Sequence, residues 1–298
     1  KAGGTAVSNT DGSITSSVSA NAEYGFSIVT YTGAGSTQTI GHGLGKVPKM
    51  ILVKKRSSTE NWGVYHVGIG NGNRLALNST GSSTSTTTWN NTTPTSSVFS
   101  VGAASLSNTS GDTYVAYCFA DIPGYQRFGS VDTGSDPIVI TGFKPRFLLT
   151  KKTSGSEHWF LHDSERDSDD DDNTTTFEVN NNGASESGAN RKVKFLDNGF
   201  QLVGADVDVS SATSIYWAIG DDEIGSDEDC LVDVPNAVTA DADATDTTGG
   251  YQRGNYATLN PLDQGTSSTL SNGNLDMDAT ATADNNCPST IGMSSGKW

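Results

Sequence analysis

Short segments in which hydrophobic and polar residues alternate recur along the whole chain, separated by turns rich in Gly, Ser, Thr and Asn. Alternation with a period of two is typical of β-strands, and no stretch shows the 3.6-residue apolar period of an amphipathic helix. The segments lie at residues 26–31, 50–54, 62–67, 74–77, 98–101, 114–119, 138–140, 146–150, 159–161, 176–179, 193–196, 200–203 and 215–219. The pattern predicts an all-β protein built as a sandwich or barrel.

The chain carries the same arrangement of residues twice. Three pairs share a spacing of 97 positions: Pro48 and Pro145, Lys54 and Lys151, Trp62 and Trp159. A repeat of about 100 residues is long enough for a core of its own and too long for a solenoid unit. We therefore expect two tandem β-sandwich-like domains, repeat 1 at residues 25–123 and repeat 2 at residues 124–222.

Three further segments flank the repeats. Residues 1–24 are small and polar, which predicts an extended N-terminal arm that must lean on a neighbour to be ordered. Residues 223–254 are acidic and rich in Ala, Thr and Gly, which is typical of a linker. Residues 255–298 are expected to start a third β unit, because Asn272 and Gly273 form a strong hairpin signal.

Composition limits the partners. The 298 residues have a formal net charge of −16, so the chain should repel nucleic acid and anionic membranes. No apolar run approaches the roughly 18 residues of a membrane span, so membrane insertion is not expected. The three cysteines, Cys118, Cys230 and Cys287, are far apart and imply neither a disulfide framework nor a zinc site.

Catalytic motifs are weak. Ser294 lies in a G-x-S-x-G pattern, but a nucleophile elbow needs a later histidine, and all four histidines precede it. A Gly/Ser turn is the favoured interpretation. The glycine-rich residues 41–46 and 68–72 resemble phosphate loops only loosely and are expected to form β-turns. Because no pair of carboxylates can be assigned as acid and base, we expect no enzyme.

One acidic run matches the ligand spacing of a calcium loop. Positions 1, 3, 5, 7 and 12 of such a loop fall on Asp167, Asp169, Asp171, Asn173 and Glu178. Position 6, where a Gly makes the sharp turn, is Asp172. Calcium binding and a solvated acidic surface loop both stay open here, and no other cofactor is expected.

Aromatic and histidine residues have structural and functional interpretations. Trp62 and Trp159, at equivalent places in the two repeats, could stack on glycans, but core packing is favoured. His158 and His162 lie four residues apart on an expected strand, which separates them by roughly 13 Å. A single metal ion cannot easily reach both, so a structural or surface role is favoured.

Several segments together resemble a family. They include Gly25-Phe-Ser-Ile-Val-Thr-Tyr-Thr-Gly33, Gly41-His-Gly-Leu-Gly-Lys-Val-Pro-Lys-Met-Ile51, Trp89-Asn-Asn91, Ser96-Ser-Val-Phe-Ser100 and Gly111-Asp-Thr-Tyr-Val-Ala-Tyr-Cys-Phe-Ala120. They resemble a domain of tail-fibre-like structural proteins of marine bacteriophages. The similarity is close over residues 25–123 and looser over residues 124–222. Residues 255–298 resemble the start of a SPRY-type, concanavalin-like domain.

The resemblance implies a non-enzymatic structural protein located in the virion, an extracellular particle. It would be a tail fibre or appendage component that acts as a spacer and in host attachment. The expected partners are sister chains in a homo-oligomer, with a trimer as the expected order, other virion proteins, and host surface glycans. The arm and residues 255–298 would be the inter-subunit pieces. Three alternatives stay open: a carbohydrate-binding adhesin module, a capsid decoration or head fibre protein, and a polysaccharide depolymerase.

Overall fold

The computed structural model describes residues 3–166, 173–207, 212–220, 268–271 and 276–279. Its regular structure there is almost entirely β-strand. The exceptions are the short helix α1 (Ser105–Asn108) and the 3₁₀ turn η2 (Ala189–Arg191). The antiparallel sheets pack face to face as sandwiches, so the predicted all-β, sandwich-like fold class is confirmed.

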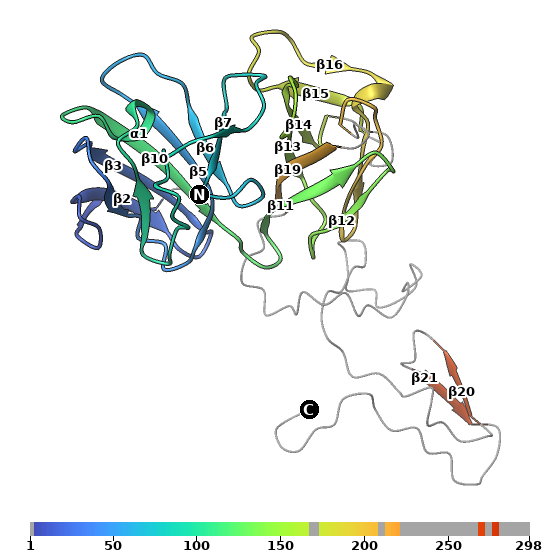
Figure 1. The fold of residues 1–298 in the computed structure, drawn as a ribbon. Coiled ribbons are helices and arrows are strands. Elements are labelled where there is room, and N and C mark those ends of the chain that lie inside the picture. Colours follow the sequence, from blue (N-terminus) through green and yellow to red (C-terminus); the bar gives the residue numbers. More distant parts are fainter. Residues whose placement is uncertain (1–2, 167–172, 208–211, 221–267, 272–275, 280–298) are drawn as a thin grey trace. The chain divides into compact units, whose positions relative to one another are not determined.

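Repeat 1 is built on an eight-stranded sheet, the first large sheet, in the order β1-β2-β3-β10-β5-β6-β7-β8 (Figure 1). Its strands are β1 (Val7–Asn9), β2 (Ser16–Asn21), β3 (Phe26–Thr32), β5 (Pro48–Lys55), β6 (Gly63–His66), β7 (Asn73–Ala76), β8 (Thr84–Ser85) and β10 (Thr113–Ala120). A two-stranded sheet of β4 (Gln38–Gly41) and β9 (Val98–Val101) covers one face. The core between them includes Ile40, Phe99, Tyr114 and Trp89.

Repeat 2 follows the same plan. Its large sheet, the second large sheet, has the order β11-β19-β13-β14-β15-β16. The strands are β11 (Gln126–Thr133), β13 (Phe147–Lys152), β14 (Trp159–Asp163), β15 (Thr175–Glu178), β16 (Glu186–Ser187) and β19 (Ala212–Ile219). A three-stranded sheet of β12 (Ile138–Ile140), β18 (Gly199–Leu202) and β17 (Val193–Leu196) covers one face. Phe195, Phe200 and Tyr216 lie in the core between these two sheets.

A third core joins the two repeats. It contains Met50, Leu52, Val64, Leu75 and Phe119 from repeat 1, and Phe128, Leu149, Trp159 and Ile215 from repeat 2. The two large sheets therefore pack directly against each other through the faces that their own small sheets leave uncovered. We call this set the shared core. The result is four stacked β layers rather than two separate sandwiches.

The sequence of β5 shows how one strand serves two cores. Ile51 and Val53 point into the core of repeat 1, whereas Met50 and Leu52 point into the shared core. Side chains on a strand alternate between its two faces, so a strand with two buried faces must be apolar at nearly every position. The continuous run 50–53 has that property.

The N-terminal segment, expected as an extended arm that leans on a neighbour, forms two strands of the first large sheet. Residues 16–21 form β2, which pairs with β3, and β1 pairs with β2 in turn. Its order therefore comes from strands of its own chain. Val18 of β2 lies in the hydrophobic core and Ala20 packs against it, and the hydrogen bonds to β3 make up for the low apolar content.

The Ser/Thr-rich loop around residue 80 of repeat 1 is hydrogen-bonded to repeat 2, although its composition is typical of a mobile loop. The Ser83 amide donates to the Thr153 carbonyl at 2.8 Å, and the Glu157 amide donates to the Thr80 carbonyl at 3.0 Å. Lys151 Nζ donates to the same Thr80 carbonyl at 3.3 Å. Backbone and side-chain bonds thus fix this loop of repeat 1 onto repeat 2.

The chain divides into two compact units, Lys1–Ile224 and Gly225–Trp298. Both repeats belong to the first. In the second, β20 (Ser268–Ser271) and β21 (Asp276–Ala279) form the antiparallel hairpin that the Asn272-Gly273 pair predicts, although the turn itself lies outside the described residues.

We predict that Trp159→Ala destabilises the protein far more than Trp62→Ala. Trp159 is fully buried in the shared core, and its indole N–H donates to the Ala76 carbonyl of repeat 1 at 3.0 Å. Truncating such a side chain costs about 3–5 kcal/mol. Trp62, its repeat 1 equivalent, is only half-buried and stacks on Tyr117. Urea unfolding followed by circular dichroism measures both losses, and equal losses would contradict the shared core.

Candidate functional site

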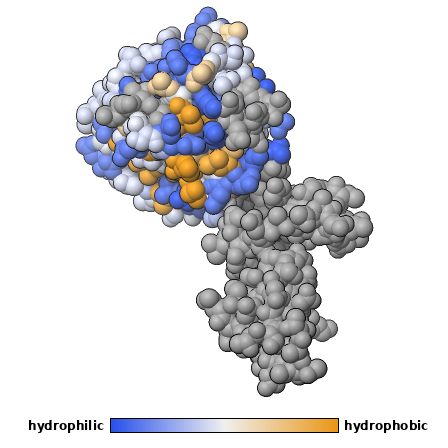
Figure 2. All heavy atoms as spheres, turned by 90° about the vertical axis from the view of Figure 1, so that its right-hand side faces the viewer, coloured by the Kyte–Doolittle hydropathy of each residue, from blue (hydrophilic) through white to orange (hydrophobic). Residues whose placement is uncertain are grey.

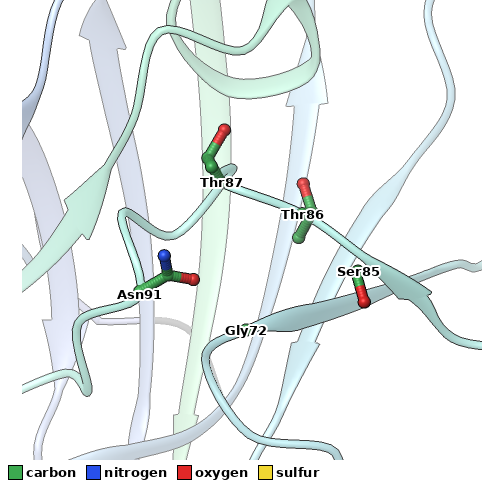
Figure 3. A pocket seen from close by; sticks show the side chains of 5 residues that line it. All are labelled: Gly72, Ser85, Thr86, Thr87 and Asn91. Atoms are coloured by element: carbon green, nitrogen blue, oxygen red, sulfur yellow. The ribbon is translucent and has the colours of Figure 1, made fainter.

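An open depression of about 610 Å³ lies on repeat 1, lined by Gly72, Ser85, Thr86, Thr87 and Asn91 (Figure 3). Gly72 precedes β7, Ser85 ends β8, and the other three residues follow in the chain. None of these side chains is ionisable. The depression can therefore offer hydroxyl and amide hydrogen bonds but no general acid or base.

Local turns shape this depression. The Thr86 amide donates to the Gly72 carbonyl at 2.9 Å, which holds its two sides together. Asn90 and Asn91 adopt positive φ angles of 50° and 47°, a region that asparagine tolerates better than most residues. Trp89, the residue before this asparagine pair, is buried, and its indole N–H donates to the Asn73 carbonyl. This aromatic ring therefore belongs to the core and does not line the depression.

Sequence reasoning did not identify the depression. It placed Gly72 in an expected β-turn, and the Ser/Thr composition of residues 85–87 is typical of a plain loop. The available signal was the Asn90-Asn91 pair, since two consecutive asparagines favour a turn with positive φ.

The two equivalent tryptophans have different roles. Core packing is confirmed for Trp159, which is buried. Trp62 is half-buried and stacks on Tyr117 with ring centroids 6.2 Å apart. Tyr117 in turn stacks on Phe26 at 6.4 Å. These three rings form a row on the large sheet of repeat 1, beside the shared core.

The predicted calcium ligands are only partly within the described residues. Asp167, Asp169 and Asp171 lie outside them. Asn173 is fully buried, and its amide Nδ2 donates to the Asp163 carbonyl at 2.8 Å. Glu178 lies on β15. The predicted calcium site is therefore not tested at its three aspartates, and it stays a prediction.

Glu178 already has partners for its carboxylate, among them Arg191 and His158. Its carboxylate lies 2.7 Å from Arg191 Nη2 and 3.3 Å from His158 Nδ1. Burial pushes the pKa of Glu178 upward, but the Asn181 hydrogen bond and the proximity of His158 and Arg191 outweigh it, so the pKa lies below its usual value. A carboxylate held this way would have to exchange these partners for a calcium ion. Within the described ranges, no three His, Cys, Asp or Glu side chains form a group able to hold a metal ion.

The buried histidines bind backbone carbonyls. Nε2 of His42, His66 and His162 lies 3.1, 3.1 and 2.7 Å from the carbonyls of Thr95, Tyr216 and Arg191, respectively. His66 Nδ1 also accepts from the Gly68 amide at 3.0 Å, which assigns the proton to Nε2. His66 thereby connects repeat 1 to β19 of repeat 2. These contacts support the structural role favoured for His162.

Cys118 and Lys151 are further titratable groups that are buried. Burial raises the pKa of the Cys118 thiol to about 12, which makes it a poor nucleophile. Burial lowers the pKa of Lys151 to about 8, and its ammonium donates to the Thr80 and Lys152 carbonyls. Both groups sit among strands rather than in the depression. Ser294 lies outside the described residues, and within them no helix is long and apolar enough to cross a membrane.

Comparison with known proteins identifies a family. A family model described as Domain of unknown function (DUF7483) matches residues 1–222. This range contains the N-terminal strands and both repeats, and it ends close to Ile224, where the first compact unit ends. No curated protein and no solved structure matches the chain.

We predict that the free energy of unfolding falls as the pH drops from 6.5 to 4, in part through His66. Burial lowers the pKa of His66 to about 4 in the folded protein, from 6.5 when unfolded. The unfolded state therefore binds a proton in this window that the folded state does not, which costs about 3 kcal/mol. His66→Gln should be less stable at neutral pH, and its difference from wild type should shrink toward pH 4. Urea unfolding against pH tests this, and parallel curves would contradict it.

We predict that Glu178→Gln lowers the free energy of unfolding by about 1–3 kcal/mol, because a charged hydrogen bond to Arg191 is lost. The loss should be the same with calcium and with a chelator. Glu165→Gln is the matched control, since its ion pair with Arg146 is exposed and contributes little. A loss at Glu178 that appears only with calcium would show that the carboxylate is a ligand.

Proposed function

The chain belongs to the DUF7483 family, whose description states no function, and we propose that it is a non-enzymatic structural component of a phage particle. It acts as a tail fibre or appendage segment, a rigid spacer that carries host-attachment parts. The observation that carries this proposal is the shared core. The resemblance of residues 25–123 to tail-fibre-like proteins of marine phages supplies the type of particle.

A shared core suits a spacer because it removes the hinge between tandem domains. Two domains joined by a small polar interface are expected to move relative to each other. Here Phe128 and Trp159 of repeat 2 pack among Met50 and Phe119 of repeat 1. Bending at this junction would expose aromatic surface to water, which is unfavourable. The two repeats should therefore hold a fixed distance and direction.

The histidines support a structural role over a catalytic one. His42, His66 and His162 direct Nε2 at backbone carbonyls, so none of these ring nitrogens is placed to accept a proton from a nucleophile. The depression of Figure 3 contains no titratable group. A depolymerase is therefore the weakest of the alternatives.

The assembly is proposed to be a homo-oligomer in contact with other virion proteins. Three-fold order, which the resemblance implies, stays a prediction. The net charge of −16 supports placement on the outside of a particle, because it keeps the protein soluble and away from nucleic acid.

A carbohydrate-binding adhesin is the second candidate, because the Ser85–Asn91 depression is open and lined with hydroxyl and amide groups. Sugar hydroxyls pair with such groups. The lining has no aromatic platform, which makes this candidate weaker than the spacer.

We expect an antibody raised against the chain to label purified particles of the source phage at an appendage, as seen by immunogold electron microscopy. A structural protein also appears in the particle proteome in a fixed ratio to the other virion proteins. Absence from purified particles, with the chain found only in the lysed host, would contradict the proposal.

A glycan array separates the two candidates. The spacer predicts no saturable binding. An adhesin that uses the depression predicts binding that Thr87→Val weakens and that Thr113→Val, the loss of an exposed hydroxyl elsewhere on repeat 1, leaves unchanged. Repeating the array with a chelator tests for a calcium contribution.

A further inference from the structure

The duplication allows a strand-by-strand comparison of the two small sheets. Ile40 of β4 pairs with Phe99, and Val139 of β12 pairs with Phe200, in the same antiparallel register. These four side chains point into the cores of their repeats. β12 is therefore the repeat 2 equivalent of β4, and Ile138 and Ile140 stand where repeat 1 has Thr39 and Gly41.

In repeat 1 the N-terminal segment covers the outer edge of β4. The Ile14 amide donates to the Thr39 carbonyl at 3.0 Å, and Ile14 forms a parallel bridge with Ile40. The Ser16 hydroxyl donates to the Gly41 carbonyl at 2.9 Å. A polar segment of the same chain thus satisfies the backbone groups along this edge.

Repeat 2 has no such cover among the described residues. β12 is the terminal strand of its sheet, with β18 on one side only. Ile138 and Ile140 are 57% and 58% exposed, unusually high for two isoleucines on a single strand. Figure 2, which views this side of the molecule, shows hydrophobic residues gathered among polar ones. An uncovered apolar edge strand is a surface that proteins usually protect.

The backbone of β12 presents its free groups at this edge. The Leu202 amide donates to the Pro137 carbonyl, and the Thr141 amide donates to the Asn198 carbonyl. Backbone direction alternates along a strand, so residues 137, 139 and 141 face β18. The N–H and C=O groups of Ile138 and Ile140 therefore point away from β18, toward an edge that no described strand covers.

A polar segment like the one that covers β4 would not fit against the edge of β12. Any side chain at Gly41 would meet Asn9 Oδ1 at 1.6 Å, so the cover depends on the missing side chain. Its other contacts with Thr39 use both hydroxyls: the Ser13 amide donates to Thr39 Oγ1, and the Thr39 amide donates to the Ser13 hydroxyl. At the position of Gly41, Ile140 carries a large side chain, and at the position of Thr39, Ile138 offers no hydroxyl. The partner of β12 must therefore be apolar and shaped differently.

We propose that the edge of β12 pairs antiparallel with β12 of a second copy of this chain, about a two-fold axis at Val139. The sequence Ile138-Val139-Ile140 is the same in both directions, so two copies paired antiparallel about Val139 place residues of the same type opposite each other. Ile138 of each copy lies opposite Ile140 of the other, and their outward N–H and C=O groups form the new hydrogen bonds. Four isoleucines then cover one another, and the two small sheets become one six-stranded sheet.

This pairing concerns how two chains meet and does not depend on the virion role. It is two-fold, so in a three-fold assembly it would link two trimers. Light scattering after size exclusion should give twice the 31.1 kDa of one chain, or six times that mass if three-fold contacts also form.

The first test compares variants at equal concentration. Ile138→Thr with Ile140→Gly copies the repeat 1 residues, and Ile140→Pro removes an outward N–H without touching the bonds to β18. Both should weaken the two-fold association by about tenfold or more. Val47→Lys, an exposed valine of repeat 1, should leave the mass unchanged. An unchanged mass in both edge variants, or a monomeric wild-type chain, would overturn the proposal.

The second test reads the register directly, in chains with Cys230 and Cys287 replaced by serine. Opposed residues in a hydrogen-bonded antiparallel pair have Cα atoms about 5.5 Å apart, within disulfide range, whereas diagonal positions are too far apart. A mixture of Ile138→Cys and Ile140→Cys chains should therefore form disulfide-linked dimers under mild oxidation. Either variant alone should not. Equal cross-linking of the single variants would rule out this register.

Discussion

The packing of the two large sheets against each other is the constraint on which the rest of the structure depends. Each of these sheets is buried on both faces, by its own small sheet on one side and by the other large sheet on the other. Burial of this kind requires apolar residues at consecutive positions, as in the run 50–53. In repeat 2 the neighbours Leu148 and Leu149 divide in the same way, since Leu148 enters the core of repeat 2 and Leu149 enters the shared core.

The polar contacts between the repeats follow from that packing. Once the sheets meet, any polar group at the junction must find a partner inside it, because an unpaired buried group is costly. His66 binds the Tyr216 carbonyl, Trp159 binds the Ala76 carbonyl, and Lys151 binds the Thr80 carbonyl. Each of these bonds joins one repeat to the other. They fix the relative position of the repeats more narrowly than apolar contact alone, and this suits a spacer.

The sequence predicted most of the strands that carry β-branched and aromatic residues, and the ranges 98–101, 138–140 and 193–196 agree with the structure to the residue. It missed β4 and β11, although these strands carry Ile40 and Phe128. It failed for β2, whose Ser-rich sequence has little apolar character and whose order comes from pairing with β3. The calcium spacing included Glu178, but spacing carries no information about Arg191, which ends the turn η2 and pairs with Glu178.

The shared core was also not predicted. An apolar run such as residues 50–53 indicates a strand with two buried faces, but it does not identify the element that covers each face. The open edge of β12 was missed for a related reason. Ile138 and Ile140 fit a strand in any position of a sheet, and only the comparison with Thr39 and Gly41 shows that no described segment covers them as the N-terminal segment covers repeat 1.

Native-state hydrogen exchange of the full chain tests most directly whether the two repeats act as one body. Ala116 of β10 and Ala218 of β19 are fully buried in the central strands of the two large sheets. If the shared core joins the repeats, both amides exchange only through the same global opening, with equal free energies. If Ala218 exchanges through an opening that leaves Ala116 protected, the repeats are independent domains and the rigid spacer is contradicted.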